Sequence, residues 1–362
     1  MFKTIPSEEY LENITNLIKK SKNTIYIQAM YFCFDDSLKG FVEELIGAKK
    51  RGVDVKLNID NYSVPYNNGH KYLIHIKKEN RIKCVSAASK SKNYLNMLIE
   101  NGVDINFINQ YKYGKFLSEY IPFLGRNHMK ITLIDDVSFI GGINFSSKSF
   151  NYSDFMIRTE NKDMLSALKK IFIDNRDNKK QNDKKIKIND RNILLVDSGK
   201  ARQSIIYESS IECINNAKES IRYISQFFPD FKILDALENA VNRGVNVEII
   251  THSNEIAEKK YRHKIEKILF NISNSNISNV YENSDRYIHA KMMIIDKDTS
   301  SPSVILGSHN FSTFGVLFGT AEISIYSKEK DLISELYIWY SNIKIKSNSL
   351  IRFHRITESV KQ

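Results

Sequence analysis

Two stretches of the 362-residue chain are built alike: residues 25–59 read IYIQAMYFCFDDSLKGFVEELIGAKKRGVDVKLNI, and residues 221–250 read IRYISQFFPDFKILDALENAVNRGVNVEII. Each has a β-rich run, an aromatic cluster, an Asp, an amphipathic segment that ends in Arg-Gly-Val, and a second β-rich run. The apolar residues of the middle segments recur at helical spacing. Gly52 and Gly244 stand where the end of a helix needs left-handed backbone. Each stretch is therefore predicted to form a strand–helix–strand unit with two parallel strands in a mixed sheet.

The repeat continues into a second feature, a His-x-Lys segment that leads into an apolar strand. The first copy is HMKITLID at residues 128–135, followed by GGIN at residues 141–144, and the second is HAKMMIID at residues 289–296, followed by GSHN at residues 307–310. Residues two apart on a strand project from the same face, so each His and its Lys should point together. The apolar residues behind each Lys predict a strand buried on both faces, which would hold the pair rigidly at the edge of a cleft.

The repeat predicts an α/β fold with two homologous lobes related by a pseudo-two-fold axis, each a mixed, mostly parallel β-sheet flanked by helices. The lobes are expected at residues 1–178 and 191–362. The segment RDNKKQNDKKIKIND at residues 176–190 holds five lysines and few apolar side chains, which is typical of a solvated linker or a long surface loop. We expect the linker itself at residues 179–190. Residues 70–97 are Lys-rich and expected to be partly helical, and residues 111–125 could be either a lid over the substrate or ordinary core packing.

Charge and cysteine content limit the partners and the compartment. The chain has 53 Lys and Arg against 42 Asp and Glu, a net charge of +11, which favours nucleic acid or an acidic membrane face without choosing between them. The chain has three cysteines, Cys33, Cys84 and Cys213, and no two of them are spaced as a metal-binding pair. A disulfide framework is therefore not expected, and a reducing compartment fits best. No signal-peptide core is seen and no apolar run reaches the length of about 18 residues that a spanning helix needs. We therefore expect a cytoplasmic protein that associates peripherally with the membrane.

The paired motifs resemble the HKD signature of the phospholipase D superfamily, and the resemblance covers nearly the whole chain. Finer details are similar to the cardiolipin synthase branch of that superfamily: Arg126-Asn127-His128, residues 139–144 (FIGGIN) and residues 227–230 (FFPD). The chain departs from the family pattern in two places. The turn between Asp135 and Gly141 is one residue shorter, and Ile143 stands where many members have Ser. The resemblance implies two phospholipase D-like lobes with one active site between them.

The resemblance also implies a nucleophile and an acid–base catalyst in the two motif histidines. His128 is assigned as the nucleophile that forms a phosphohistidine and His289 as the general acid, although the two roles could be exchanged. Attack on a phosphodiester builds negative charge on the phosphoryl oxygens, which a metal or fixed donors must neutralise. No cluster in the sequence has metal-ligand spacing, so we expect no metal and no cofactor. The expected phosphate-binding donors are Lys130, Lys291, Asn144, Asn310 and Ser308.

Four acidic residues complete the predicted site. A motif histidine needs an acceptor that fixes its tautomer, and by the resemblance Asp154 and Glu322 occupy the places of these acceptors. Asp135 and Asp296 end the two motifs, and the resemblance implies that they hold the strand–turn geometry. His309 could also approach the site, since it lies between Ser308 and Asn310.

The leading function is phosphatidyl transfer between phospholipids or to an alcohol, as in a cardiolipin synthase. The alternatives are a phospholipase D that hydrolyses phospholipid to phosphatidic acid, a nuclease of the same superfamily, and a binding protein with a dead site. The expected partners are a phospholipid substrate and an anionic phospholipid membrane surface, with nucleic acid less favoured. Because both motifs lie in one chain, a monomer is expected.

Overall fold

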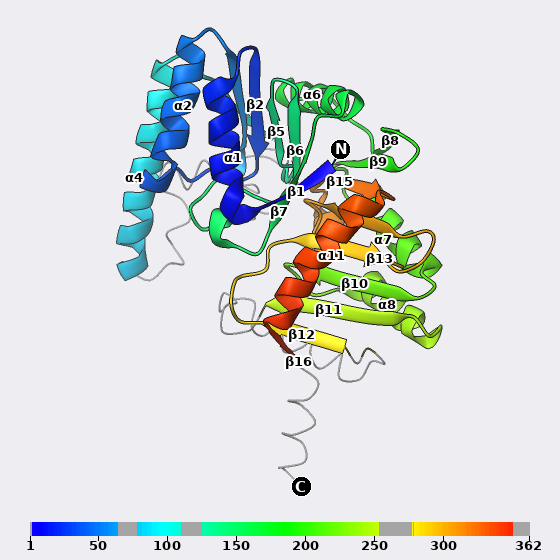
Figure 1. Cartoon of the computed structure of the whole chain (residues 1–362). Coiled ribbons are helices and arrows are strands. Elements are labelled where there is room, and N and C mark those ends of the chain that lie inside the picture. The colour runs from blue at the N-terminus through cyan, green and yellow to red at the C-terminus, as the bar shows by residue number, and fades with distance from the viewer. Residues whose placement is uncertain (1, 64–77, 110–124, 253–276, 278, 350–362) are drawn as a thin grey trace.

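Two mixed β-sheets, one from each half of the chain, form the framework of the computed structural model (Figure 1). The structure describes residues 2–63, 78–109, 125–252, 277 and 279–349. In the first sheet the order is β1 (Phe2–Pro6), β7 (Phe155–Thr159), β6 (Val137–Gly141), β5 (Ile131–Ile134), β2 (Thr24–Ala29), β3 (Asp54–Asp60) and β4 (Asp104–Ile108). In the second it is β16 (Ser347–Ser349), β12 (Asn279–Asn283), β11 (Asn246–His252), β10 (Ser220–Ser225), β13 (Lys291–Ile295), β14 (Ser303–Gly307), β15 (Ala321–Ser327), β9 (Asn192–Ser198) and β8 (Lys184–Lys187). The shared order confirms the predicted α/β fold of two similar lobes.

The strand–helix–strand units lie at the predicted places. Strands β2 and β3 are parallel and are connected through α2 (Lys39–Lys50). Strands β10 and β11 are parallel and are connected through α8 (Phe231–Asn242). Gly52 and Gly244, just beyond these helices, have φ angles of 89° and 88°, a conformation that a residue with a side chain rarely adopts.

The prediction that the sheets are mostly parallel is wrong. Among the described strands, the parallel pairs are β2–β3 and β3–β4 in the first sheet, and β10–β11 and β11–β12 in the second. The remaining neighbours are antiparallel, including the motif hairpins β5–β6 and β13–β14. A turn of a few residues can only return the chain antiparallel, whereas a parallel neighbour needs a long crossover. The sequence indicates the strand–helix–strand units, whose strands are indeed parallel. It gives no reason to expect the same parallel pairing for the other strands of each sheet.

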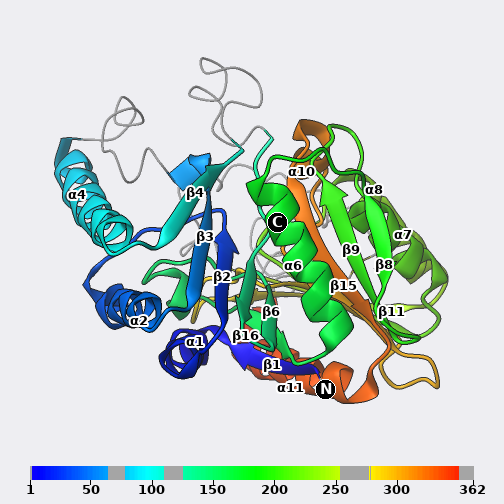
Figure 2. The same ribbon diagram turned by 90° about the horizontal axis from the view of Figure 1, so that it is seen from above.

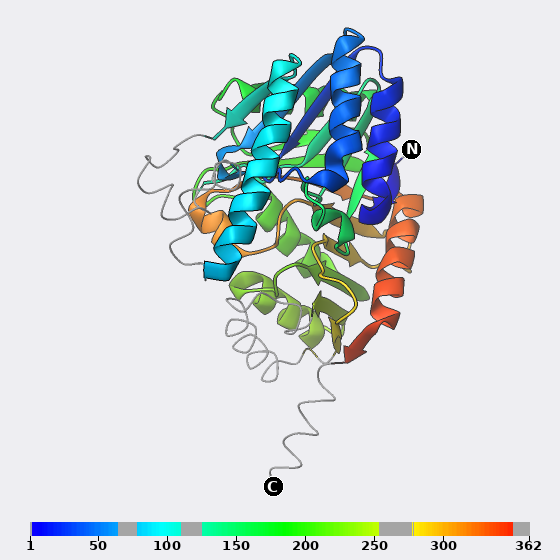
Figure 3. The same ribbon diagram turned by 90° about the vertical axis from the view of Figure 1, so that its left-hand side faces the viewer.

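Helices cover both sheets and fill the space between them. Helices α1 (Ser7–Lys20), α2 and α4 (Lys78–Glu100) lie on the outer side of the first sheet, as Figure 3 shows from that side. Helices α7 (Ile205–Asn216) and α8 lie on the outer side of the second. Helices α6 (Lys162–Arg176) and α11 (Lys330–Ile345) lie on the inner faces (Figure 2). One core contains Ile131 and Phe172 of the first half together with Ile323 and Tyr340 of the second, so the two lobes share apolar packing.

The structure describes all of one and part of another of the segments that lie outside the repeated units. The charged stretch at residues 176–190 holds the edge strand β8, paired with β9, where the sequence suggested only a linker or loop. Ile186 of β8 packs against the core while Lys185 and Lys187 face outward, and lysines on an edge strand discourage further pairing. The lobe boundary at 179–190 stays a prediction. Helix α4 confirms helical structure from Lys78 onward, whereas residues 111–124 lie outside the described residues. Within the described part of the chain, no helix is long and apolar enough to cross a bilayer.

Candidate active site between the lobes

The two motifs enter the same seam between the lobes, each beside a segment of the other lobe. The His128 N–H donates to the Ala321 carbonyl at 2.8 Å, and the Ala321 N–H donates to the Arg126 carbonyl at 2.8 Å. At the related place, the His289 N–H donates to the Ser153 carbonyl at 3.0 Å. Ala321 and Ser153 directly precede Glu322 and Asp154. Each motif histidine is therefore held next to the acidic residue of the opposite lobe.

Each histidine contacts that acidic residue through its ring. The Nδ1 atom of His128 lies 3.0 Å from both carboxylate oxygens of Glu322, and Nδ1 of His289 lies 2.6 Å from Oδ2 of Asp154. All four side chains are buried. A carboxylate beside Nδ1 favours the tautomer with the proton on that nitrogen. The structure thus brings these four residues together in two pairs, and each pair joins one lobe to the other.

Two buried lysines lie beneath the histidines. Lys130 and Lys291 are each only 1% exposed. The Lys130 ammonium donates to the His128 carbonyl at 2.6 Å. The Lys291 ammonium donates to the His289 carbonyl and to Oε1 of Gln226, the latter at 3.3 Å. Burial lowers the pKa of Lys291 to about 8 and the pKa of Lys130 well below its ordinary value.

The imidazoles respond to both lysines at once. Burial, and then the charges of Lys130 and Lys291, hold the pKa of His128 well below its ordinary value. Burial lowers the pKa of His289 to about 3, and the same two ammonium groups act in that direction while Asp154 opposes them. Because each ammonium acts on each imidazole, the four side chains form one electrostatic unit. Both imidazoles are neutral at neutral pH in the free protein.

The surroundings of Glu322 differ from those of Asp154. The Ser308 hydroxyl donates to Glu322 and accepts from the Ile323 N–H at 3.0 Å. Burial raises the pKa of Glu322. His309 lies close enough to Glu322 and His128 for both to act on its pKa. Burial lowers the pKa of His309 to about 4, Glu322 opposes this shift, and His128 adds to it. The Phe311 N–H donates to Nδ1 of His309 at 2.9 Å. The predicted phosphate-binding role of Ser308 stays a prediction, since its hydroxyl is directed to Glu322.

The glycines and amides that follow each motif also border the site. The side-chain oxygens of Asn144 and Asn310 are buried and have no hydrogen-bond partner among the residues that the structure describes. Gly142 packs directly on the acceptor of the second histidine, because a Cβ at this position would lie 2.6 and 2.7 Å from the two carboxylate oxygens of Asp154. A residue larger than glycine would therefore push Asp154 out of place.

Asp135 and Asp296 lie away from this cluster, at the far ends of β5 and β13. Asp135 accepts from the backbone N–H groups of Asn23 and Thr24 at 2.8 and 2.9 Å and from that of Lys22 at 2.9 Å. Asp296 accepts in the same way from three successive N–H groups at residues 218–220. These contacts join each motif strand to the start of the neighbouring strand, β2 or β10. They support a structural role for the two aspartates.

Two residues near the site were missed from the sequence. Asp197 of β9 stands opposite Glu322 of β15 in the sheet register. Burial raises its pKa to about 7, and the Ser204 hydroxyl donates to it at 2.5 Å. No motif marks Asp197, because strand pairing joins it to a distant segment. Gln226, which contacts Lys291, follows the first strand of the second repeat and could have been noted there.

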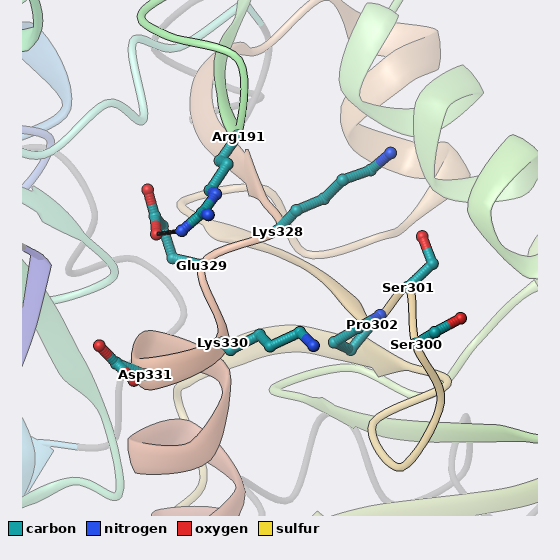
Figure 4. Close-up of a pocket in the computed structure, with 8 residues that line it drawn as sticks. All are labelled: Arg191, Ser300, Ser301, Pro302, Lys328, Glu329, Lys330 and Asp331. Atoms are coloured by element: carbon teal, nitrogen blue, oxygen red, sulfur yellow. Dashed lines mark hydrogen bonds and ion pairs between the residues drawn. The ribbon is translucent and has the colours of Figure 1, made fainter.

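A separate pocket of about 430 Å³ lies at the opposite end of the motif strand (Figure 4). It is lined by residues 300–302 of the β13–β14 turn, Arg191 and residues 328–331. Strand β13 begins beside His289 and runs toward this turn, so the pocket is separated from the histidines by the length of the strand. In Figure 4, Arg191 pairs with Glu329, at 3.2 Å.

The curated relatives of this chain are cardiolipin synthases. The cardiolipin synthase of Listeria welshimeri is 27% identical over 232 residues, which cover 58% of this chain and 46% of that protein. A probable cardiolipin synthase of Bacillus subtilis is 22% identical over 316 residues, which cover 81% of this chain and 57% of that protein. The chain thus spans about half the length of the curated relatives it matches.

A solved structure and a family model cover more of the chain. Phosphatidylserine synthase of Haemophilus influenzae superposes with a TM-score of 0.69 at 13% identity, over 97% of this chain and 87% of that one, which shows a shared fold. The family model described as "Cardiolipin synthase, PLD-like domain" matches residues 14–176 and 210–343, and so includes both motifs. This chain belongs to that family of the phospholipase D superfamily.

Proposed function

We propose that this chain transfers a phosphatidyl group from one phospholipid to another, or to an alcohol, at a single site built by both lobes. The observation that carries the proposal is the crossed pairing, in which His128 contacts Glu322 and His289 contacts Asp154. Neither half of the chain contains a complete histidine–carboxylate pair of its own motif. A site of this kind is matched to one phosphate held between two imidazoles.

In the first step, Nε2 of neutral His128 attacks phosphorus and the bond from phosphorus to the headgroup oxygen breaks. With Nδ1 at Glu322, Nε2 is the ring nitrogen that would meet phosphorus. The depressed pKa of His128 keeps the imidazole neutral and therefore nucleophilic. The departing oxygen takes a proton from His289 and leaves as an alcohol, while the phosphatidyl group stays on His128 as a phosphohistidine.

His289 must carry a proton for that step, although its pKa in the free protein is about 3. A bound phosphodiester brings a negative charge next to the two lysines, and this charge offsets their repulsion of an imidazolium. Asp154 stabilises the protonated form directly through its contact of 2.6 Å. Glu322 also accepts from the Ser308 hydroxyl and lies 3.0 Å from His128. His289, the proposed acid, therefore has the closer carboxylate contact of the two histidines.

The second step reverses the roles. His289 accepts the proton of an incoming hydroxyl, the oxygen attacks phosphorus, and the bond between phosphorus and His128 breaks. Lys130 and Lys291 stabilise the negative charge on the phosphoryl oxygens in both steps. The amide N–H groups of Asn144 and Asn310 are assigned as donors to the phosphoryl oxygens. Their buried side-chain oxygens, which have no hydrogen-bond partner among the described residues, are acceptors that would meet a hydroxyl of the incoming alcohol.

The identity of the substrate rests on the relatives and on charge. Relatives named cardiolipin synthases support a phospholipid substrate. A net charge of +11 suits an anionic lipid surface. The same catalytic groups would serve hydrolysis, so transfer depends on whether an alcohol or water reaches the phosphohistidine.

The test is incubation of the purified chain with phosphatidylglycerol vesicles, followed by mass spectrometry of the lipids. Cardiolipin and glycerol are expected, and both His128→Asn and His289→Asn should abolish them. Phosphatidic acid in place of cardiolipin would replace transfer by hydrolysis. Unchanged lipid together with cleavage of single-stranded DNA, measured in parallel, would contradict the proposal in favour of a nuclease.

A further inference from the structure

A short helix stands at the rim of the site between two of its residues. Helix α10 (Thr313–Phe318) begins three residues after Asn310 and ends four residues before Glu322. The Gly125 N–H, close to the first motif, donates to the Phe318 carbonyl at 3.1 Å. Helix α10 therefore lies against the segment that leads into the first motif.

Large apolar side chains on and beside α10 are exposed. Phe314 is 45% exposed and Leu317 is 49% exposed. Phe231, at the start of α8, is 72% exposed and has a φ angle of 41°. Asp230 joins it to α10, because its carboxylate accepts from the Thr313 N–H at 3.0 Å. We call Phe231, Phe314 and Leu317 the rim surface.

The related segment of the first lobe provides an internal comparison. It also connects a site Asn to a site acid, running from Asn144 to Asp154. Its aromatic residues Phe145 and Phe150 are 1% and 7% exposed, and both rings pack against Tyr10. Phe145 matches Phe311, which follows Asn310 in the same way and is also buried, at 0% exposed. The segment from Asn144 to Asp154 is described throughout, and none of its large apolar side chains is exposed as Phe314 and Leu317 are.

Cations flank the rim surface. Lys200, Arg202 and Lys232 are exposed. Lys232 follows Phe231 directly, and the Arg202 N–H donates to the Val316 carbonyl of α10 at 2.7 Å. Exposed aromatic and aliphatic side chains with basic neighbours are the pattern by which proteins enter the headgroup region of an anionic bilayer.

We propose that the rim surface inserts into an anionic phospholipid bilayer and holds the opening of the site against it. The inference rests on the proposed function, since a lipid substrate must leave a bilayer to reach the histidines. A second copy of the chain could instead cover the rim surface. Two copies would bring the same basic side chains together, and their repulsion disfavours such a dimer. With an anionic bilayer the same charges attract.

The experiment compares binding of the full chain to vesicles of phosphatidylcholine and phosphatidylglycerol in equal parts. One variant is Phe231→Ser with Phe314→Ser and Leu317→Ser. A second is Lys200→Gln with Arg202→Gln and Lys232→Gln. The matched control is Ile338→Ser, because Ile338 is 62% exposed on α11, which lies on the opposite side of the molecule from α10 in Figures 2 and 3.

The apolar variant should lose about tenfold or more in vesicle partition, and turnover of short-chain phosphatidylglycerol below its micelle concentration should be unchanged. The charge variant should bind phosphatidylglycerol vesicles no better than phosphatidylcholine vesicles. The control should bind as wild type does. Circular dichroism verifies folding, and the single change Phe314→Ser carries the test if the triple variant does not fold.

Unchanged partition of the apolar variant, or an equal loss in the control, would overturn the proposal. A fall in molecular mass on gel filtration, with partition unchanged, would assign the rim surface to a dimer. If wild type binds vesicles through the rim surface yet transforms no phospholipid, the proposed function fails and the membrane surface stands. If wild type transforms phospholipid but the apolar variant binds vesicles as wild type does, the proposed function stands and the membrane role of the rim surface fails.

Discussion

The residues of the site are matched across the lobes but are not equivalent. Asp154 makes one close contact to His289, whereas Glu322 is shared between His128 and Ser308. Gly142 occupies the position in the first lobe that Ser308 occupies in the second. The asymmetry gives the two imidazoles different carboxylate partners, which is what a nucleophile and an acid require.

Gly142→Ala is expected to reduce turnover by about 10- to 100-fold, because displacement of Asp154 leaves His289 without its orienting acceptor. It should also cost about 1–3 kcal/mol of unfolding free energy through overpacking. Gly40→Ala is the matched control, since a Cβ at Gly40 meets nothing within 4 Å. Steady-state kinetics and thermal melting measure both effects. Normal turnover in Gly142→Ala would show that the contact with Asp154 is dispensable.

Asp197→Asn is expected to stabilise the protein in a pH-dependent manner. The folded-state pKa of Asp197 is about 7, against about 3.9 in an unfolded chain. Ionisation of this buried carboxylate, beside Asp183 and Glu322, therefore lowers the free energy of unfolding. The loss of stability is complete above pH 7 and becomes smaller as the pH falls below 7. Asn keeps an acceptor for Ser204 and carries no charge.

Chemical denaturation should thus show a larger gain for Asp197→Asn at about pH 8 than at about pH 5. An equal gain at both values would mean that Asp197 does not titrate between them. A loss at both would assign the residue a purely hydrogen-bonding role at the start of α7.

At the scale of elements, the hairpins that carry the motifs are fastened by aspartates at their ends. Asp135 and Asp296 each accept from three backbone N–H groups at the start of the neighbouring strand. Both have left-handed backbone, with φ angles of 47° and 51°. The same connection in both lobes places both motif strands in the same register relative to β2 and β10.

Asp135→Ala should lower the free energy of unfolding by about 2 kcal/mol or more, since three donors lose a charged acceptor. Asp135→Asn should cost less, because Asn tolerates left-handed backbone and retains one acceptor oxygen. Asp136→Ala, at an exposed neighbour, should change stability by less than about 0.5 kcal/mol. Urea denaturation measures all three. Lost turnover at unchanged stability in Asp135→Ala would point to catalysis instead.

The elements that the sequence predicted well are those with local causes. Helical spacing and the glycines at positions 52 and 244 specified both strand–helix–strand units, and the apolar runs after Lys130 and Lys291 specified buried strands. Antiparallel neighbours such as β9 and β15 join distant segments, so no local pattern revealed them. The burial of Ile186 against the core, which makes β8 a strand, likewise depends on a surface that only the folded protein provides.

At the scale of the whole molecule, the two lobes pack together as one body. Their inner faces share a core, and their backbones pair at Ala321 with the first motif and at Ser153 with the second. Repetition of the motif predicted two matching sets of residues. It could not predict that each set is completed by the other lobe, because the crossing is a property of the assembled interface. Asp197 escapes prediction for a related reason, since it comes beside Glu322 only through the pairing of β9 with β15 inside the second sheet.

The measurement closest to the central claim is identification of the residue that carries the phosphatidyl group during turnover. Wild type, His289→Asn and His128→Asn are each mixed with phosphatidylglycerol labelled with radioactive phosphorus. The samples are quenched in alkali, in which the phosphorus–nitrogen bond of phosphohistidine is stable, and the label is mapped by peptide mass spectrometry. We predict label on His128 in wild type, and none after His128→Asn. Label on His289 would exchange the two roles, whereas turnover with label on neither histidine would contradict a shared site that works through a phosphohistidine.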